Sequence, residues 1–331
     1  MILVTGGTGL VGSHLLYHLT QKNEHIRAVY RSEESLQKVR NVFSYYTAEI
    51  EALFSKIEWR QADITDVPSM IPVFEGITHV YHCAAFISFD PVDYREMRKT
   101  NIHGTAIMAN LAIDAKVQKF CYVSSIAAIG DDPKKPIADE SNEWSGNENN
   151  HGYAITKYGG EMEVWRASQE GVDVVVVNPG VILGSGFWDS GSGKIFSNVA
   201  NGFKFYTNGT TGFVSVGDVV KSMILLMEGE VKNERFILVS ENKSFQDILF
   251  KIADEFGKKR PSKLVKPWES ELFWRWEWLM SKLMSRRTRM SKQSAKSLHS
   301  ISKYSSEKIQ KAIGFQFEKI DEVIEQVCKD Y

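Results

Sequence analysis

Short apolar runs alternate with stretches of helical periodicity through the first half of the chain. Runs of strand length lie at residues 1–7, 25–32, 77–85, 119–125 and 172–180. Between them, apolar residues recur at helical spacing, most clearly after Gly9 and in the segments Asn101–Ala115 and Tyr153–Ser168. The run at 172–180 is apolar on both faces, as expected of a parallel strand covered by helices on both sides. We therefore predict an α/β fold with a doubly wound parallel sheet.

The pattern changes after Gly184. Residues 184–194 are rich in glycine and serine and have no period, which indicates a loop. The apolar runs at 213–220 and 234–240 predict returns to the sheet, and the final third is helical and irregular. We expect two units with these bounds: a sheet domain of residues 1–182 and 214–240, and a smaller, mostly helical C-terminal lobe of residues 183–213 and 241–331.

Composition excludes several classes of protein. The 331 residues are 43% hydrophobic, which is enough for a large core, and 40 Lys+Arg against 41 Asp+Glu argue against a nucleic-acid binder. The three cysteines are scattered without a C-x-x-C motif, so we expect neither a disulfide framework nor a metal site. The first apolar run breaks at Gly6, and no run approaches the ~20 apolar residues of a membrane span. These features predict a cytoplasmic protein.

A glycine triplet lies between the first predicted strand and the helix that follows. Glycine suits backbone that needs a positive φ or must approach a pyrophosphate closely, and a helix N-terminus attracts phosphate. An ordinary glycine turn is the alternative, but strand, triplet and helix coincide, which favours a Rossmann-like NAD(P)-binding site. The smaller lobe would then bind the substrate. The predicted loop contacts are Gly6, Thr8, Gly9, Leu10, Val11 and Gly12.

The end of the second predicted strand bears on cofactor choice. Proteins that use NAD usually place Asp or Glu there for the ribose 2′-hydroxyl. Here Arg31 occupies the position and Lys38 follows, and two cations suit a 2′-phosphate. We predict NADP, with NAD as the alternative if Arg31 is a solvated surface residue and Glu33 or Glu34 takes the acidic role.

Tyr153 and Lys157 are spaced four residues apart, which places them on one face of a predicted helix. A nearby ammonium stabilises a phenolate, so we expect a lowered pKa for Tyr153. Such a tyrosine could exchange a proton with a carbonyl or alcohol oxygen while hydride moves to or from a nicotinamide. Ser125 or the neighbouring Ser124, at the end of the fourth strand, could polarise the same oxygen.

Taken together, these motifs resemble the extended short-chain dehydrogenases/reductases of the NAD-dependent epimerase/dehydratase superfamily. The family's order is followed by TGGTGLVG, ADIT, HCAA, NIHGT, VSSIAAIG, YAITK, NPGVILG and FVSVGDVV. The resemblance implies Ser125, rather than Ser124, as the serine that acts with Tyr153 and Lys157. It also implies Asn101 as the asparagine that shapes the active site. No metal is implied.

The same resemblance implies further cofactor contacts. Asp63 and Ile64 would contact the adenine, Ala84 and Ala85 would line the cofactor, and residues 179–182 would lie against the nicotinamide through Pro179, Val181 and Ile182. The family's lysine, Lys157 here, also holds the nicotinamide ribose. The alternative interpretations are that Asp63 is a turn residue and Ala84 a packing residue.

Within the family, the details resemble the branch of dihydroflavonol reductases, cinnamoyl-CoA reductases and hydroxysteroid dehydrogenases. Our first hypothesis is an NADP(H)-dependent oxidoreductase that interconverts a small-molecule carbonyl and its alcohol. The second is an NAD-dependent sugar-nucleotide epimerase or dehydratase, against which Arg31 and the absence of arginine from NPGVILG argue. The third, a non-catalytic nucleotide-sensing protein, conflicts with the intact Ser125, Tyr153 and Lys157.

Two surfaces carry predictions about partners. In many family members the helices matching 101–115 and 153–168 form a four-helix dimer interface, so the resemblance implies a homodimer. The apolar candidates are Ile102, Ile107, Met108, Leu111, Ile155, Met162, Val164 and Trp165.

The aromatic helix at 267–284 precedes a basic stretch, and three interpretations stay open: a lid over the substrate, a peripheral contact of residues 268–303 with an anionic membrane, or a site for an anionic substrate tail. The seven cations of that basic stretch are Lys282, Arg286, Arg287, Arg289, Lys292, Lys296 and Lys303.

Overall fold

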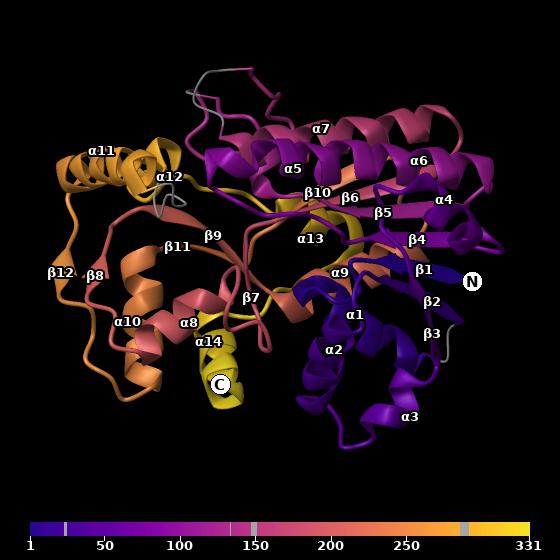
Figure 1. Cartoon of the computed structure of the whole chain (residues 1–331), viewed down its shortest axis with the longest axis horizontal. Helices are drawn as coiled ribbons and strands as arrows, with labels where there is room; N and C mark the ends of the chain where they lie inside the picture. Colours follow the sequence, from indigo (N-terminus) through magenta and orange to yellow (C-terminus); the bar gives the residue numbers. More distant parts are fainter. Residues whose placement is uncertain (23–24, 133, 147–150, 285–290) are drawn as a thin grey trace.

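The computed structural model describes residues 1–22, 25–132, 134–146, 151–284 and 291–331. Its centre is a seven-stranded sheet in the order β10-β6-β5-β4-β1-β2-β3, and every paired strand in it is parallel (Figure 1). This confirms the predicted doubly wound sheet. The strands are β1 (Ile2–Thr5), β2 (Ile26–Tyr30), β3 (Ile57–Gln61), β4 (His79–His82), β5 (Lys119–Val123), β6 (Asp173–Pro179) and β10 (Glu234–Leu238).

Helices cover both faces of this sheet because alternate strand side chains point to opposite sides. Val175 and Val177 pack with helices α1, α2 and α9, whereas Val174 and Val176 pack with α6 and α7. The covering helices are α1 (Leu10–Gln21), α2 (Glu34–Ser44) and α9 (Val216–Glu228) on one face, and α6 (Thr105–Asp114) and α7 (Gly152–Gln169) on the other. Shorter helices in or beside this domain are α3 (Ile50–Phe54), α4 (Val67–Met70), α5 (Tyr94–Arg98) and α13 (Glu307–Ile313).

The second lobe is built around a smaller sheet in the order β11-β9-β7 (Figure 1). Its apolar core joins that sheet to helices α8, α10 and α14, with Phe196, Ile248 and Ile324 fully buried. The elements are β7 (Val181–Leu183), β9 (Thr210–Ser215), β11 (Glu241–Ser244), α8 (Gly193–Ala200), α10 (Phe245–Glu255) and α14 (Ile320–Asp330). A two-stranded sheet joins β8 (Phe205–Tyr206) to β12 (Lys263–Leu264).

One predicted strand is placed wrongly by the sequence pattern. Residues 213–220 were expected to return to the central sheet, but Phe213–Ser215 belongs to β9 of the smaller sheet and α9 starts at Val216. The Ser215 hydroxyl accepts a hydrogen bond from the Asp218 amide at 2.8 Å, which caps the helix and ends the strand. The companion prediction for 234–240 is confirmed, since β10 pairs with β6.

Helices α6 and α7 lie side by side, as the predicted dimer interface requires, but part of the predicted face is wrong. Met108 and Val164 are fully buried in the chain's own core against the sheet. Among the other candidates, Ile155 and Met162 are exposed. Apolar surface therefore remains on this pair of helices, and the dimer stays a prediction.

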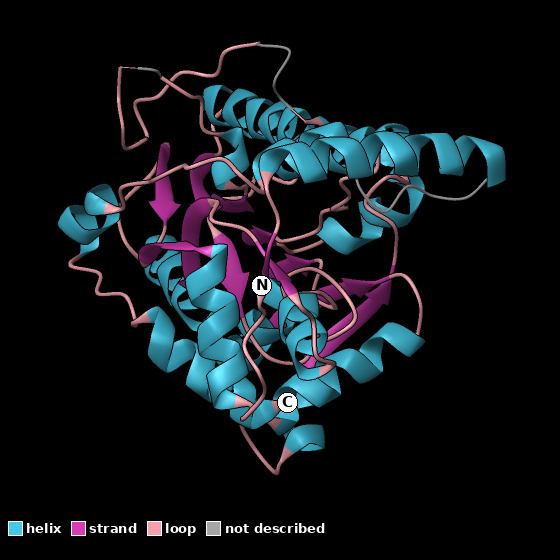
Figure 2. Ribbon diagram, turned by 90° about the vertical axis from the view of Figure 1, so that its left-hand side faces the viewer, coloured by secondary structure: helices cyan, strands magenta, loops and turns pink. Residues whose placement is uncertain are grey.

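Helices α11 (Pro267–Met284) and α12 (Lys292–Ser297) lie together at one end of the molecule, away from the central sheet (Figure 1). Figure 2 views the molecule from that end. The predicted aromatic helix is thus confirmed as a helix. Of the cations predicted to follow it, Arg286, Arg287, Arg289 and the side chain of Lys282 lie outside the described residues. In the described ranges, the chain forms no helix with the length and apolar character needed to cross a bilayer.

Candidate active site

The glycine loop is shaped by close backbone contacts. Gly6 has a φ of +67°, and a Cβ there would lie 2.5 Å from the backbone nitrogen of Ala84. A Cβ on Gly12 would lie 2.2 Å from the Gly6 carbonyl oxygen, so α1 could not pack this close to β1 with any larger residue. The Gly9 amide donates a 3.0 Å hydrogen bond to the same carbonyl, which closes the turn. The sequence therefore needs glycine at these positions for conformational reasons.

The start of α1 suits a phosphate group. Gly9 occupies the N-cap with extended backbone, and no side chain caps the helix. The first-turn amides of Leu10, Val11 and Gly12 therefore keep the N–H groups and the partial positive charge that a helix N-terminus offers to an anion. Thr8 and Leu10 are half-buried at the surface of the loop. The glycine loop and the N-terminus of α1 therefore fit a dinucleotide pyrophosphate.

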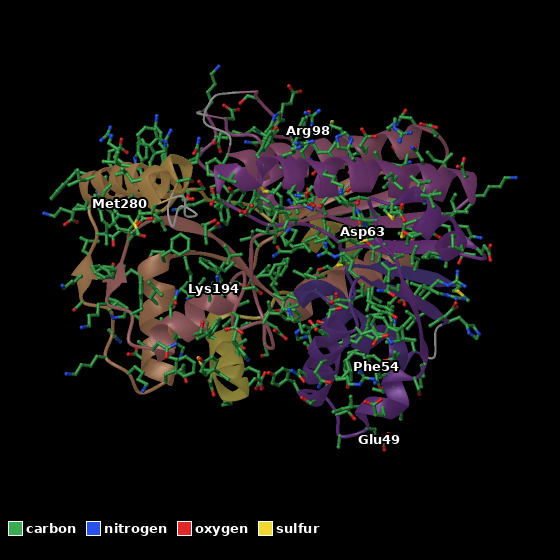
Figure 3. The ribbon with its side chains drawn as sticks, in the orientation of Figure 1. Glu49, Phe54, Asp63, Arg98, Lys194 and Met280 are labelled. Atoms are coloured by element: carbon green, nitrogen blue, oxygen red, sulfur yellow. The ribbon has the colours of Figure 1, made fainter. Side chains whose placement is uncertain are left out.

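The predicted adenine-side residues gather at one edge of the sheet. Arg31 is exposed directly after β2, and its carbonyl accepts a 3.1 Å hydrogen bond from Nε2 of the Gln61 side chain. Burial favours a raised pKa for Asp63, but hydrogen bonds from Thr65 and the charge of Arg31 outweigh it and hold the pKa below its usual value. Asp63 is labelled in Figure 3. Arg31 and Asp63 thus lie close enough to interact.

Charge at this edge is mixed. Lys38 is exposed on α2, and so are Glu33 and Glu34, the alternative acidic candidates. Because cations and carboxylates are both exposed here, either could face the 2′-position of the adenine ribose. The Asp63 carboxylate accepts two hydrogen bonds of 2.8 Å from Thr65, from its amide and its hydroxyl, so the carboxylate also stabilises a turn.

The remaining predicted cofactor residues lie at or after the carboxyl ends of strands. Ile64 is buried and would contact a Cβ on Gly104, so its side chain serves the core. The Ala84 backbone presses on Gly6, and Ala85 is exposed beside it. Pro179 ends β6 as a buried residue, whereas Val181 and Ile182 of β7 are half-buried. All of them follow the carboxyl ends of central strands, where ligands of doubly wound sheets bind.

Two adjacent serines after β5 have different partners. The Ser124 hydroxyl is buried and donates a 2.8 Å hydrogen bond to the Glu161 carboxylate. The Ser125 hydroxyl accepts a 3.1 Å hydrogen bond from the Ala127 amide and lies close enough to the Tyr153 hydroxyl to act on its pKa. Of the two, Ser125 is therefore the one whose hydroxyl meets the tyrosine.

Lys157, one helical turn after Tyr153 on α7, is bound to the end of β5. Its Nζ donates a 2.7 Å hydrogen bond to the Val123 carbonyl oxygen and lies 4.5 Å from the centre of the Tyr122 ring. Burial lowers the pKa of Lys157 to about 7, and the negative charge of Glu161 opposes that fall. An ammonium at this depth is held by a carbonyl and an aromatic face, with a carboxylate nearby.

The predicted fall in the pKa of Tyr153 is wrong for the chain alone. Burial raises the pKa of Tyr153 to about 12, and the nearby Ser125 hydroxyl only partly offsets that rise. The cause is desolvation, which penalises the phenolate more than its surroundings stabilise it. The hydroxyl is therefore protonated at neutral pH, the form that donates a proton to a carbonyl oxygen.

The Asn101 side chain binds the backbone of Phe86 rather than facing Tyr153. Its side-chain oxygen accepts a 2.8 Å hydrogen bond from the Phe86 amide, and its Nδ2 donates to the Phe86 carbonyl at 2.9 Å and to the Thr156 hydroxyl at 3.0 Å. Asn101 lies in a π-helical turn, Lys99–Gly104, between α5 and α6. It fixes the segment that carries Phe89, whose ring meets the Tyr153 ring edge-to-face at 5.9 Å.

A buried charge missed by sequence reasoning completes the site. Glu161 accepts hydrogen bonds from Ser124 and from Asn178, the latter at 3.1 Å, and pairs with Arg235 at 3.2 Å. Its side chain is fully buried. The signal that could have found it is spacing, because Glu161 follows Lys157 by four residues on α7 just as Lys157 follows Tyr153.

Comparison with known proteins agrees with this geometry. A family model described as "NAD dependent epimerase/dehydratase family" matches residues 2–238, which include the glycine loop, Ser125, Tyr153 and Lys157. The chain belongs to this family. Membership in the NAD dependent epimerase/dehydratase family confirms the predicted resemblance and an NAD(P)-dependent enzyme of the reductase and epimerase type.

The similar proteins include some that are named as reductases. The chain is 30% identical to "Sterol demethylase protein B" of Methylococcus capsulatus over 80% of its own length and 77% of the relative's. It is 29% identical to a "Putative dihydroflavonol 4-reductase" of Synechocystis over 80% of this chain and 75% of that one. The crystal structure of gox2253 superposes with a TM-score of 0.81 at 23% identity, covering 99% and 97% of the two chains, and shares the fold.

Proposed function

We propose that this chain is an NADP(H)-dependent oxidoreductase that interconverts a carbonyl and an alcohol, with Tyr153 as general acid and base. The observation that carries the proposal is the closeness of the Ser125 hydroxyl to the Tyr153 hydroxyl, whose pKa it lowers, at the edge of the sheet that also carries the glycine loop. Two hydroxyls that converge in this way can both contact one substrate oxygen. By this proposal the domain of the seven-stranded sheet binds the cofactor, and the second lobe, built around β7, β9 and β11, binds the substrate.

Each side chain has a role in the proposal. Ser125 donates to the carbonyl oxygen and orients it, and Tyr153 delivers the proton to that oxygen during reduction. The Lys157 ammonium stabilises the phenolate that remains. Asn101 keeps the Phe86 backbone, and with it Phe89, against the site. The nicotinamide, when bound, supplies or accepts the hydride.

The choice between NADP and NAD depends on what binds the 2′-position of the adenine ribose. The exposed guanidinium of Arg31 can bind a 2′-phosphate in a bidentate manner, and the exposed Lys38 can add a second charge. These features support NADP over NAD.

An exposed aromatic side chain beside Tyr153 supports an apolar substrate. Phe89 is 56% exposed although its ring lies edge-to-face against the Tyr153 ring, and Ile87, two residues before it in the chain, is equally exposed. A polar sugar would leave this surface uncompensated, whereas an apolar ring would bury it. The relatives named for a sterol demethylase and a dihydroflavonol 4-reductase support the same substrate class.

The proposal is tested by a substrate panel of ketones and aldehydes, with consumption of NADPH and of NADH as separate readouts. Ring-containing apolar ketones should be reduced faster with NADPH. Sugar nucleotides, assayed in parallel for epimerised product, should remain unchanged. Turnover of sugar nucleotides without net cofactor consumption would contradict the proposal and identify an epimerase.

A further inference from the structure

Helix α11 carries a stripe of apolar side chains that faces the solvent instead of the protein. Trp268, Leu272, Trp276, Leu279 and Leu283 follow one another at intervals of three or four residues, which places them on one face of the helix. All five are exposed, between 50% (Leu279) and 71% (Leu283). Figure 3 shows side chains projecting from this helix, where Met280 is labelled, at the outer end of the molecule.

Two polar side chains of α11 lie on the side opposite this stripe and are turned inward. Ser270 and Glu277 are almost fully buried, and the Ser270 hydroxyl is hydrogen-bonded to Nε2 of His299 at 2.8 Å. The helix therefore does not use its apolar stripe to pack onto the protein. Large apolar patches that stay exposed in this way mark a surface for a partner.

The sequence around α11 is strongly basic. Residues 258–306 contain thirteen Lys and Arg against three Glu, in a chain whose net charge is −1. Of these cations, Lys263 on β12 and Lys266 directly before the helix are exposed.

The three glutamates do not interrupt the stripe. Glu269 accepts a hydrogen bond from the Lys266 amide, Glu271 pairs with Arg275 at 2.7 Å, and Glu277 is buried.

We infer that α11 is a docking surface for an anionic lipid bilayer, on which it lies parallel to the membrane plane. Tryptophan and leucine on one face insert into the boundary between headgroups and acyl chains. The flanking lysines are attracted to acidic headgroups. The inference concerns where the enzyme works and stands independently of its reaction.

Charge decides between a membrane and a second copy of the chain as the occupant of this surface. Two copies related by symmetry would bring identical patches together, and each patch carries the same positive excess. Like charges across such an interface oppose association. An anionic bilayer complements both the stripe and the cations, so it is the occupant that the surface fits best.

The test uses the full chain and vesicles of phosphatidylcholine, alone or mixed with phosphatidylglycerol, separated by flotation. The wild-type protein should float with the mixed vesicles and much less with phosphatidylcholine alone, and added salt should weaken binding. Brominated lipid should quench the tryptophan fluorescence of the bound protein, because Trp268 and Trp276 enter the bilayer.

Two variants and a control separate the contributions. The double substitution Leu272→Ser and Trp276→Ser should weaken partition by about tenfold or more, since it removes two inserted side chains. Lys263→Glu with Lys266→Glu should weaken it by about 25-fold or more, but only on the mixed vesicles, because each cation near an anionic surface contributes roughly fivefold. Ile71→Ser, an exposed apolar position outside α11, should bind like the wild type.

Thermal unfolding of each variant checks that it is folded. Absence of wild-type binding to the mixed vesicles, or equal binding by the Leu272→Ser, Trp276→Ser variant, would overturn the inference. A dimer in solution that the same double variant converts to a monomer, without vesicle binding by the wild type, would assign the stripe to a second copy instead. Neither outcome bears on carbonyl reduction, which is assayed separately.

Discussion

The Lys157 ammonium donates a 2.7 Å hydrogen bond to the carbonyl oxygen of Val123, the last residue of β5. The bond ties α7 to the end of the central sheet, one residue before Ser124 and two before Ser125. Because Lys157 is 1% exposed, no water shell supports its charge. Its pKa of about 7 therefore places the ammonium-to-amine transition in the working range of an enzyme.

The first prediction follows from that pKa. If the ammonium form assists proton transfer, the rate of carbonyl reduction should fall as the pH rises through about 7, because Lys157 loses its proton there while Tyr153, with a pKa of about 12, keeps its own. The charge of Glu161 raises the pKa of Lys157, so Glu161→Gln should move the midpoint of the profile to lower pH.

Glu163→Gln is the matched control for this prediction. Glu163 lies on the same helix but is partly exposed and pairs with Arg166 at 3.1 Å. Its removal should leave the midpoint of the pH profile of kcat in place. A midpoint that does not move in Glu161→Gln would show that Lys157 is not the group that titrates.

The second prediction concerns cofactor choice. Arg31→Ala should weaken NADPH binding by roughly 10- to 150-fold, the equivalent of losing one charge-assisted contact of ~1.5–3 kcal/mol, and should leave NADH binding nearly unchanged. Arg60→Ala is the control, since Arg60 is an exposed arginine on the neighbouring strand β3 that pairs with Glu58 at 2.6 Å. Cofactor titrations by fluorescence measure both. Unchanged NADPH affinity in Arg31→Ala would rule out a 2′-phosphate contact.

The third prediction is loss of stability in mild acid. Burial lowers the pKa of His82 to about 3 and that of His14 to about 4, so both stay neutral in the folded chain while they are protonated in the unfolded chain below about pH 6.5. The unfolded state then binds more protons, and stability falls with decreasing pH by about 1.4 kcal/mol per unit for each histidine.

Denaturant titrations between pH 6.5 and 5 measure this loss. Asp218 acts in the opposite direction, because burial raises its pKa to about 6, so the contribution of His82 is isolated by comparison with a variant. His82→Asn should roughly halve the slope of unfolding free energy against pH that the two histidines produce. Substitution of the exposed His103 by Gln should leave that slope unchanged. Equal slopes in all three proteins would contradict the assignment.

The fourth prediction concerns assembly. Ile155 and Met162 remain exposed on α7 at 38% each, beside α6. If these helices pair with a second copy, Ile155→Asp should convert a dimer to a monomer by placing a charge in a buried interface. Val67, exposed on α4 at 41%, supplies the control substitution Val67→Asp. Light scattering at micromolar concentration reports the mass. A monomeric mass for the wild-type protein would contradict the predicted dimer.

Local patterns predicted the parts of this molecule that depend on neighbouring residues in sequence. The glycine loop, the Tyr153 and Lys157 spacing and the doubly apolar β6 all express a period or a tight turn. Strand β3 was missed because it lies at the sheet edge, where charged residues such as Glu58 and Arg60 replace an apolar run. The start of α9 was missed because a single capping hydroxyl, Ser215, ends the strand.

Features that depend on distant contacts could not be predicted from the sequence. The partners of Ser124 and Ser125 differ because Glu161 lies on one side and Tyr153 on the other, and both come from α7. Desolvation of Tyr153 is a property of the assembled site, so the direction of its pKa shift was missed. The stripe on α11 has the same spacing whether it faces the core or the solvent.

The central claim is that Tyr153 supplies the proton. Tyr153→Phe removes the hydroxyl and keeps the ring that packs against Phe89, so NADPH affinity should change little while turnover falls by ~10²-fold or more. Tyr158→Phe, on the same helix and stacked on Trp144, is the matched control and should retain turnover. Turnover and cofactor affinity, measured on the same preparations with a substrate from the panel, test the claim directly. Near-normal turnover in Tyr153→Phe would contradict it and would assign the proton to Ser125 or to a bound water.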